Sequence, residues 1–266
     1  MKRQFIVVIA GITIVVVLVA LFTLVGKSKN PQSNFQKTYL KEADMAFLNG
    51  DLLLAKKLYE QAQEKTDDTT RLKEIQRKIE DINIKIIFSP VIDKCAKKYI
   101  VRPNDSLAKI AKENNTTIEL IKRTNNLSSD VIRPEQELKI TTCKFSIVAD
   151  KSQNLLFLKV GDEIIKTYVV STGKNNSTPV GVFKIINKQP NPTWFRAGAV
   201  VPPNSPENIL GTRWLGIEAK GYGIHGTTAP EDLGKQVTLG CIRMRNEEVE
   251  ELYDIVPVGT EVTIID

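Results

Sequence analysis

An uncharged stretch near the N-terminus sets the strongest limit on how this chain can fold. Residues 5–26 are 22 positions without a charge, rich in Val, Ile and Leu, with Lys2 and Arg3 before them and Lys27 after them. At about 1.5 Å per residue, a helix of this length crosses a bilayer core of about 30 Å. A cleaved signal peptide is the alternative, but its apolar region is usually about 7 to 15 residues long and ends in small residues. The sequence therefore predicts an uncleaved, single-pass transmembrane anchor over 5–26.

The distribution of charge bears on the class of partner. The formal net charge is +6, and residues 1–143 carry 24 Lys and Arg against 17 Asp and Glu, whereas residues 144–266 carry 13 against 14. Nucleic-acid-binding proteins usually present a basic face. Here the basic excess forms no such face and has no interleaved aromatic residues. We therefore expect no nucleic-acid partner, and at most a weak attraction to anionic lipid or wall polymer.

Residues 35–87 have the periodicity of helices. Apolar side chains recur at three- or four-residue steps as far as Phe47, stop at Gly50 and Asp51, and resume at Ala55. This pattern predicts a helical hairpin followed by a third helix whose isoleucines could pack back on the pair. The hairpin is similar to a single tetratricopeptide unit. Because such units normally need about three repeats to bury their faces, a spacer or a weak dimer contact is favoured over a peptide-binding groove.

Residues 95–143 show the order strand, helix, helix, strand. The strand at 99–102 is followed by a helix cap at 104–106, a second helix with Thr116 and Glu119 in capping-box spacing, and a closing strand within 132–140. This stretch resembles a LysM domain, which implies binding of the N-acetylglucosamine-containing glycans of peptidoglycan through the loops between strands and helices. A module that only spaces or packs is the alternative. The resemblance assigns glycan binding to Asn104, Asp105, Ser106, Leu107, Ile132 and Pro134.

The LysM resemblance also bears on two turns and two cysteines. Asn104 and Glu135 stand where that family usually has glycines. Cys95 and Cys143 flank the module, and because its first and last strands pair, the two thiols are placed to form a disulfide. Such a bond would add about 4 kcal/mol in the chain-entropy model and fits an oxidising compartment outside the membrane. Cys241 remains as the free cysteine.

From residue 144 onward the chain alternates short apolar strands with polar turns. This regular spacing predicts a mainly β domain over 144–266, either a sandwich or a barrel. An insertion at 187–208 is rich in proline and contains Trp194 and Phe195. A mobile flap over the substrate cleft and a plain surface loop are both open for this insertion.

The residue types needed for nucleophilic catalysis occur together near the C-terminus. His225 is the only histidine of the chain and precedes Cys241 by 16 residues. A thiol with a reference pKa of about 8.5 needs a neighbouring imidazole to supply the thiolate. Gly240 would let the backbone approach a substrate carbonyl, so that nearby amides could donate to an oxyanion. Taken singly, a lone histidine beside glycine usually lies in a turn, and a lone cysteine is usually a small buried hydrophobe.

These residues sit in a wider pattern: YGIHGT over 222–227, TLGCIRM over 238–244, and TPVG over 178–181. The pattern resembles the L,D-transpeptidase family with its YkuD-type catalytic domain. The resemblance implies that Cys241 is the nucleophile and His225 the base. It further implies that the carbonyl of Gly226 orients the imidazole, and that the amides of Gly240 and Cys241 form the oxyanion hole. It assigns substrate binding to Arg243, Tyr222 and Thr238; a structural tie to the cysteine loop is the alternative role for Arg243.

The implied reaction is acyl transfer on the stem tetrapeptide of peptidoglycan. D-Alanine leaves, and the acyl group passes to an amine to give a 3,3 cross-link, or to water as in an L,D-carboxypeptidase. No metal or cofactor is needed, and a zinc site built from the three cysteines and His225 lacks C-x-x-C spacing. A non-catalytic LysM wall-binding anchor is the alternative from another class, although both Cys241 and His225 are present. We therefore expect a multidomain α+β protein of the cell membrane, with its catalytic domain extracytoplasmic.

Overall fold

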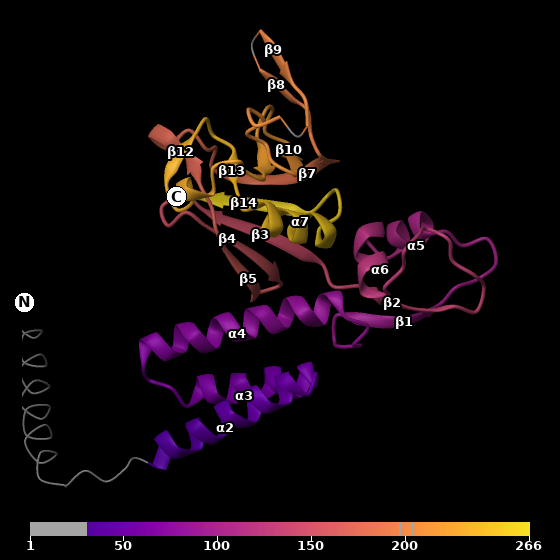
Figure 1. Cartoon of the computed structure of the whole chain (residues 1–266), viewed down its shortest axis with the longest axis vertical. Helices are drawn as coiled ribbons and strands as arrows, with labels where there is room; N and C mark the ends of the chain where they lie inside the picture. Colours follow the sequence, from indigo (N-terminus) through magenta and orange to yellow (C-terminus); the bar gives the residue numbers. More distant parts are fainter. Residues whose placement is uncertain (1–30, 197, 204) are drawn as a thin grey trace, which may run out of the picture.

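The computed structural model describes residues 31–266 apart from 197 and 204 (Figure 1). The transmembrane anchor predicted over 5–26 lies outside the described residues. Within the part that is described, none of the helices is both long and apolar enough to span a bilayer. The described chain forms a helical unit, a small α+β module and a larger β domain, which meet at one junction (Figure 1).

The helical unit consists of three helices, α2 (Pro31–Leu48), α3 (Leu52–Glu64) and α4 (Thr69–Phe88). Gly50 has φ of +79° in the turn between the first two, and the Asp51 carboxylate caps α3 by accepting from the Leu54 amide at 3.1 Å. Small alanines let α2 and α3 approach closely, and isoleucines of α4 close the cluster. The buried members of this core are Ala43, Ala46, Ala55, Leu58, Tyr59, Ala62, Ile75, Ile79, Ile82 and Ile86.

Helix α4 also packs on the β domain. Its Ile84 and Ile87 belong to the same buried cluster as the strands of the large sheet. The Asn83 side-chain amide donates to the Ile165 carbonyl at 3.1 Å, and Glu80 accepts from the hydroxyl of Thr167 at 2.8 Å. Because these polar groups are buried and paired, α4 is held against β5 (Glu163–Val169) by hydrogen bonds as well as by apolar contact.

The small module contains β1 (Ala96–Ile100), α5 (Leu107–Glu113), α6 (Ile118–Thr124) and β2 (Glu137–Thr141), with β1 antiparallel to β2. Thr117, and not Thr116 as the capping-box spacing predicted, caps α6 by accepting from the Leu120 amide at 2.9 Å. The helix therefore starts one residue later than expected, and the hydroxyl of Thr117 accepts from a backbone amide that has no partner within the helix.

The two turns that lack the expected glycines adopt the glycine conformation nonetheless. Asn104 and Glu135 both have φ of +67°. Asparagine tolerates this region, and glutamate does so less readily. The amide of Glu135 donates to the Val101 carbonyl at 2.9 Å, which ties the turn to the end of the first strand.

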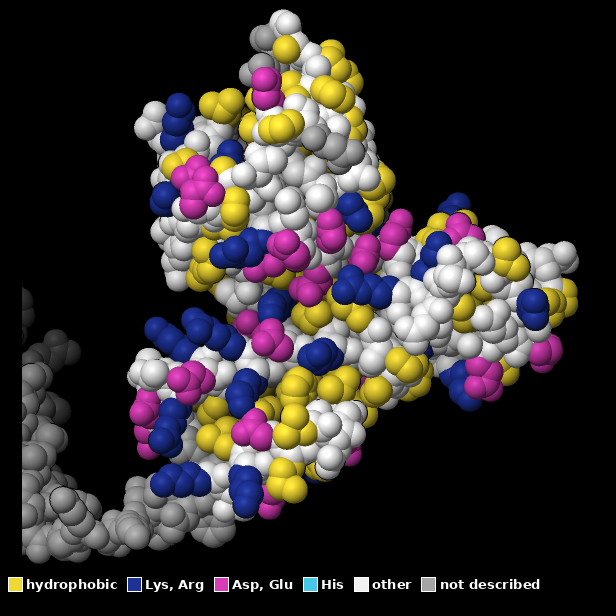
Figure 2. Space-filling model, viewed as in Figure 1, with side chains coloured by type: hydrophobic (Ala, Val, Ile, Leu, Met, Phe, Trp, Pro, Cys, Tyr) yellow, Lys and Arg dark blue, Asp and Glu magenta, His cyan; other side chains and the backbone are white. Residues whose placement is uncertain are grey.

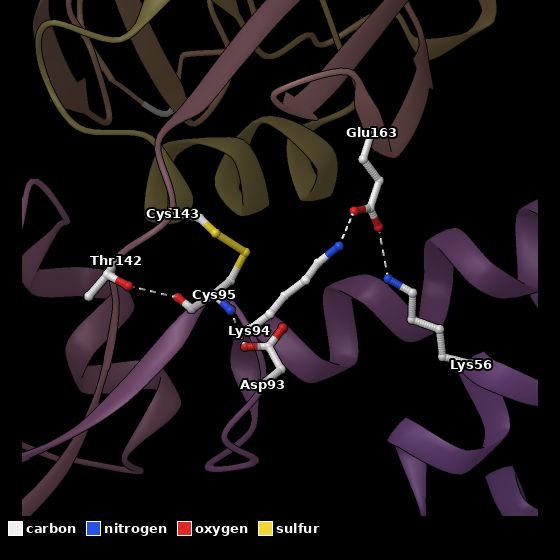
Figure 3. Close-up of a disulfide and its surroundings, with 7 residues drawn as sticks. All are labelled: Lys56, Asp93, Lys94, Cys95, Thr142, Cys143 and Glu163. Atoms are coloured by element: carbon white, nitrogen blue, oxygen red, sulfur yellow. Dashed lines mark hydrogen bonds and ion pairs between the residues drawn. A yellow bond between two sulfur atoms is a disulfide. The ribbon is translucent and has the colours of Figure 1, made fainter.

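A disulfide joins Cys95 and Cys143 at the junction of the three parts (Figure 3). Beside it, the carboxylate of Glu163 at the start of β5 pairs with Lys56 of α3 at 2.9 Å and with Lys94 at 2.5 Å. The same group therefore links the helical unit, the segment before β1 and the β domain. The zinc site considered above loses two of its ligands, because Cys95 and Cys143 are bonded to each other.

The β domain is built on one eight-stranded sheet, in place of the sandwich or barrel that the strand spacing left open. The order is β13-β11-β10-β7-β14-β3-β4-β5. Strand β7 bridges its two halves, because residues 181–184 pair with β14 and residues 185–190 pair with β10. The remaining strands of the sheet are β3 (Phe145–Asp150), β4 (Leu155–Val160), β7 (Gly181–Pro190), β10 (Arg213–Ile217), β11 (Gly223–His225), β13 (Ile242–Arg243) and β14 (Glu261–Ile265).

Smaller elements complete the domain. Strands β6 (Thr172–Gly173) and β12 (Gln236–Thr238) pair with each other, and helix α7 (Asn246–Ile255) follows β13. Within the 187–208 insertion, β8 (Trp194–Arg196) and β9 (Ala199–Val201) form a hairpin that projects from the sheet (Figure 1). Hydrophobic side chains gather on this projection (Figure 2), including Phe195 and Val200, which are 75% and 64% exposed.

The small module rests directly on α7. The Arg123 guanidinium lies 3.5 Å from the centroid of the Phe88 ring and donates to the Asp254 carboxylate at 2.9 Å. Thr117 donates from its hydroxyl to the Asp254 carbonyl. The module is therefore fixed to α7 by a charged and a polar contact, and to α4 by the contact of Arg123 with Phe88.

Candidate active site

His225 is the last residue of β11, which lies between β10 and the edge strand β13. Parallel pairing of β11 with β13 sets His225 opposite Arg243, two residues after Cys241. On the other side Trp214 of β10 is its cross-strand partner, with the two rings 6.0 Å apart between centroids and 21° from parallel. The histidine is 2% exposed. The strand order thus brings the imidazole and the cysteine loop together.

The protonation of His225 follows from its surroundings. Burial lowers the pKa of the imidazole to about 4, the carbonyl of Gly226 opposes this shift, and the charge of Arg243 adds to it. Nδ1 lies 2.7 Å from the Gly226 oxygen. Because a carbonyl oxygen only accepts, Nδ1 must carry the proton, and Nε2 keeps its lone pair. The imidazole is therefore neutral at pH 7 and able to accept a proton at Nε2.

Cys241 lies in the tight loop before β13 and is the free cysteine of the described chain. Its thiol donates to the Gly221 carbonyl at 3.7 Å, on the loop between β10 and β11. Burial raises the pKa of the thiol, while the Gly223 amide and the charge of Arg243 act in the opposite direction. The resting pair is therefore a neutral thiol beside a neutral imidazole.

Only glycine fits at position 240. Its φ is +127°, and a Cβ there would lie 2.4 Å from the ring of Tyr222 and 3.0 Å from the Ser177 carbonyl oxygen. The Gly240 amide, expected to donate to an oxyanion, already donates to the hydroxyl of Thr238 at 3.1 Å. The Gly240 amide is therefore occupied in this structure, and the role of the Cys241 amide in an oxyanion hole stays a prediction.

The three residues expected to bind substrate have different surroundings. Thr238 is buried and uses its hydroxyl within the cysteine loop, accepting from Gly240 and donating to the Cys241 carbonyl at 2.6 Å. Tyr222 is half-buried and packs against Gly240. Arg243 lies 3.7 Å from the Asp232 carboxylate, and its buried Nε has no hydrogen-bond partner among the described residues. A substrate carboxylate that bound Arg243 would therefore share the guanidinium with Asp232.

The residues expected to bind glycan divide into two groups. Asp105 is used internally: it accepts from the Tyr99 hydroxyl at 2.7 Å and from the Arg102 amide at 2.9 Å, and the Arg102 amide is the main cause that lowers its pKa to about 2. Ser106 caps α5, and Leu107 is buried. The other group comprises Asn104 and Pro134, which are exposed, and Ile132, which is half-buried; Ser106 is exposed as well, but its hydroxyl is used by the cap.

Asn246 lies near the site, and its residue type ahead of Glu247 and Glu248 is typical of a helix cap. In the structure it is instead the first residue of α7, and Arg245 occupies the cap position without a side-chain hydrogen bond. The Asn246 side chain turns instead toward the backbone beyond His225, accepting from the Thr227 amide at 3.0 Å. An asparagine at the start of a helix looks like a cap in any sequence, so no local signal separates the two roles.

Two parts of the chain match families of known proteins. The family model of the L,D-transpeptidase catalytic domain matches residues 144–264, and that of the LysM domain matches residues 99–141. A Bacillus subtilis protein named as the L,D-transpeptidase YqjB is 41% identical over 45% of this chain and 70% of its own length. Proteins named as the L,D-transpeptidase YkuD from Bacillus licheniformis and Bacillus subtilis are 36% and 34% identical, each over 62% of this chain and 97% of their own length. The chain therefore belongs to the L,D-transpeptidase family and joins a YkuD-type catalytic domain to a LysM domain.

Proposed function

We propose that this chain is a membrane-anchored L,D-transpeptidase that forms 3,3 cross-links in peptidoglycan through an acyl-enzyme on Cys241. The observation that carries the proposal is the buried neutral imidazole of His225. Its Nδ1–H is held by the Gly226 carbonyl at 2.7 Å, which leaves Nε2 as a base beside the loop of the only free cysteine among the described residues.

The first half of the reaction forms the acyl-enzyme. As Sγ of Cys241 attacks the carbonyl carbon of the third stem residue, its proton passes to Nε2 of His225. The developing oxyanion accepts from the Cys241 amide. Collapse of the tetrahedral intermediate breaks the peptide bond, and the imidazolium returns its proton to the departing amine of D-alanine. A thioester on Cys241 and a neutral His225 remain.

The lowered pKa of His225 and the raised pKa of Cys241 support a proton transfer that accompanies attack. Burial disfavours both the imidazolium and the thiolate, so the ion pair does not form ahead of the substrate. The charge of Arg243 favours the thiolate and disfavours the imidazolium. The thiol must also leave the Gly221 carbonyl, to which it donates at 3.7 Å, before it can reach Nε2.

The second half of the reaction decides between two products. An amine of a neighbouring stem gives the 3,3 cross-link, and water gives the tripeptide of an L,D-carboxypeptidase. Transfer to an amine needs water to be excluded from the thioester, and we assign this role to the projecting hairpin of β8 and β9, whose Phe195 and Val200 offer an exposed apolar surface.

The remaining parts are assigned to localisation. The predicted anchor over 5–26 holds the chain at the membrane, the helical hairpin within 35–87 acts as a tetratricopeptide-like spacer, and the module over 95–143 binds the glycan with the exposed Asn104 and Pro134. Anchor and module together raise the local concentration of stem peptide, so each needs only modest affinity. The disulfide supports an extracytoplasmic position for the catalytic domain over 144–266.

The proposal is tested with the full chain in detergent micelles, incubated with purified disaccharide tetrapeptide and resolved by mass spectrometry. A cross-linked dimer lacking one D-alanine, absent with Cys241→Ala, supports the proposal. Tripeptide without dimer identifies an L,D-carboxypeptidase. Unchanged substrate, with glycan binding retained, identifies a non-catalytic wall-binding anchor.

A further inference from the structure

The side chain of Asn246 makes three hydrogen bonds to backbone behind the imidazole of His225. Its Oδ1 accepts from the amides of Thr227 at 3.0 Å and Thr212 at 3.3 Å, and its Nδ2 donates to the Thr227 carbonyl at 2.9 Å. All but one of its amide hydrogen-bonding positions are therefore used at a single place. That place lies next to the catalytic pair, although Asn246 itself takes no part in the reaction proposed above.

One of these bonds reaches the imidazole through a single peptide group. The N–H of Thr227 and the C=O of Gly226 belong to the same planar unit. The carbonyl of that unit accepts from Nδ1 of His225 at 2.7 Å, while its N–H is held by Asn246 at 3.0 Å. Fixing the direction of the N–H therefore fixes the direction of the C=O. Hydrogen bonds in such a chain also polarise one another, which makes the carbonyl a better acceptor.

Asn246 replaces sheet pairing at the point where pairing ends. The His225 carbonyl accepts from the Met244 amide at 2.8 Å, and the Gly226 amide donates to the Arg213 carbonyl at 3.2 Å. Strand β11 ends at His225. Without Asn246, the Gly226–Thr227 peptide group would be held only through its carbonyl, by the imidazole that it orients.

Two glycines form the slot that admits the Asn246 amide. A Cβ at Gly226 or at Gly211 would each lie 2.2 Å from its Oδ1, far inside contact distance. Gly211 also has φ of +63°, which disfavours other residues independently. The local sequence thus accommodates this one side-chain amide, and helix capping does not explain it, because the cap position of α7 is Arg245.

We propose that Asn246 is a positioning residue for the catalytic base: through the Gly226–Thr227 peptide it holds His225 as the Nδ1–H tautomer, with Nε2 directed to accept the thiol proton. The proposal rests on the proposed function for the identity of His225 as the base. The hydrogen-bond geometry that supports it does not depend on which acceptor resolves the acyl-enzyme.

The single histidine of the chain makes a direct test possible. Full-length protein labelled with 15N in the imidazole is compared by NMR as wild type, Asn246→Ala and Asn246→Asp, with Asn125→Ala as the matched control. Asn125 makes the same kind of paired amide contact with backbone, at Lys139 in the LysM module. In the wild type and the control we expect the Nδ1–H tautomer at pH 7. In Asn246→Ala we expect a mixture of tautomers.

The aspartate variant separates positioning from simple loss of structure. It keeps an acceptor for the Thr227 amide, so the Nδ1–H tautomer should persist, while the added negative charge should raise the pKa of His225 above that of the wild type. Transpeptidation by Asn246→Ala should fall about 100-fold in kcat, near the lower end of what a general base contributes, and the aspartate variant should recover part of that loss.

Two results would overturn the inference. One is a wild-type tautomer in a folded Asn246→Ala protein. The other is a fall in kcat with no change in tautomer or in the pKa of His225, which would show a structural role alone. The NMR measurement needs no substrate, so an inactive wild type would contradict the proposed function while leaving the positioning of His225 to be judged separately.

Discussion

Replacing His225 by glutamine should make the fold of the catalytic domain less sensitive to acid. The imidazole is fully buried and neutral, and its pKa is lowered from 6.5 to about 4, chiefly by burial. An unfolded chain binds a proton at this histidine below pH 6.5, whereas the folded chain does so only near pH 4. The folded state therefore loses stability as the pH falls through this window, and none of this loss occurs above it.

The size of the effect follows from the shift. Each pKa unit corresponds to about 1.36 kcal/mol, so a folded-state pKa of about 4 removes about 3 kcal/mol of unfolding free energy between pH 7 and pH 4. Carboxylates also titrate near the lower end of this range, but they are shared by both proteins. The difference between wild type and His225→Gln thus isolates the histidine.

The assay is urea unfolding followed by tryptophan fluorescence at several pH values. The chain has two tryptophans, Trp194 and Trp214, and both lie in the catalytic domain. The wild type should lose about 3 kcal/mol more than the variant on going from pH 7 to pH 4. Parallel pH dependence in the two proteins would refute the argument, because it would mean that His225 is solvated and titrates normally in the folded state.

Three further predictions concern the cysteines and the glycine of the active-site loop. Replacing Cys95 and Cys143 together by serine opens a loop with a sequence separation of 48, and should lower the unfolding free energy by about 4 kcal/mol; an unchanged urea midpoint would contradict this. Gly240→Ala should abolish transpeptidation while glycan binding persists, because the added Cβ would lie 2.4 Å from the Tyr222 ring; wild-type product formation would show that the loop yields. Alkylation of Cys241 by iodoacetamide should still accelerate above pH 9, because burial raises the pKa of this thiol from 9.0; a rate that levels off near neutral pH would indicate a preformed thiolate.

Local patterns predicted the secondary structure of the small module well. The order strand, helix, helix, strand appears as β1, α5, α6 and β2. The limits of the elements shifted, since the first strand begins at Ala96 and the last is confined to Glu137–Thr141. Strand ends depend on cross-strand partners, which a local pattern does not contain.

The docking of the helical unit on the β domain had no sequence signal. Asn83 and Glu80 are polar residues on an amphipathic helix and would ordinarily face water. Both are about 5% exposed, because each is covered by β5 and forms a hydrogen bond with it, to Ile165 and Thr167. These partners lie more than 80 residues further along the chain. A contact of this kind is visible only once the tertiary fold brings β5 against α4.

The active site, too, was predictable from the sequence only in part. The motifs identified His225 and Cys241 as candidates, because nucleophilic catalysis restricts these positions to particular residue types. The sequence assigned Thr238 to substrate binding and gave Asn246 the pattern of a helix cap. The structure shows instead that Thr238 forms hydrogen bonds within the cysteine loop and that Asn246 does so behind Gly226. Each depends on backbone groups whose direction is set by glycines with unusual φ or by strand ends, and neither follows from residue type alone.

The central claim is that Cys241 carries the acyl group of the stem peptide. Its most direct test is intact-protein mass spectrometry of the full chain, quenched in acid within the first turnovers on disaccharide tetrapeptide. The account predicts an added mass equal to the disaccharide tripeptide acyl group, located on Cys241 by peptide mapping and absent from Cys241→Ala. Turnover of substrate without any such adduct, or the same adduct in Cys241→Ala, would contradict it.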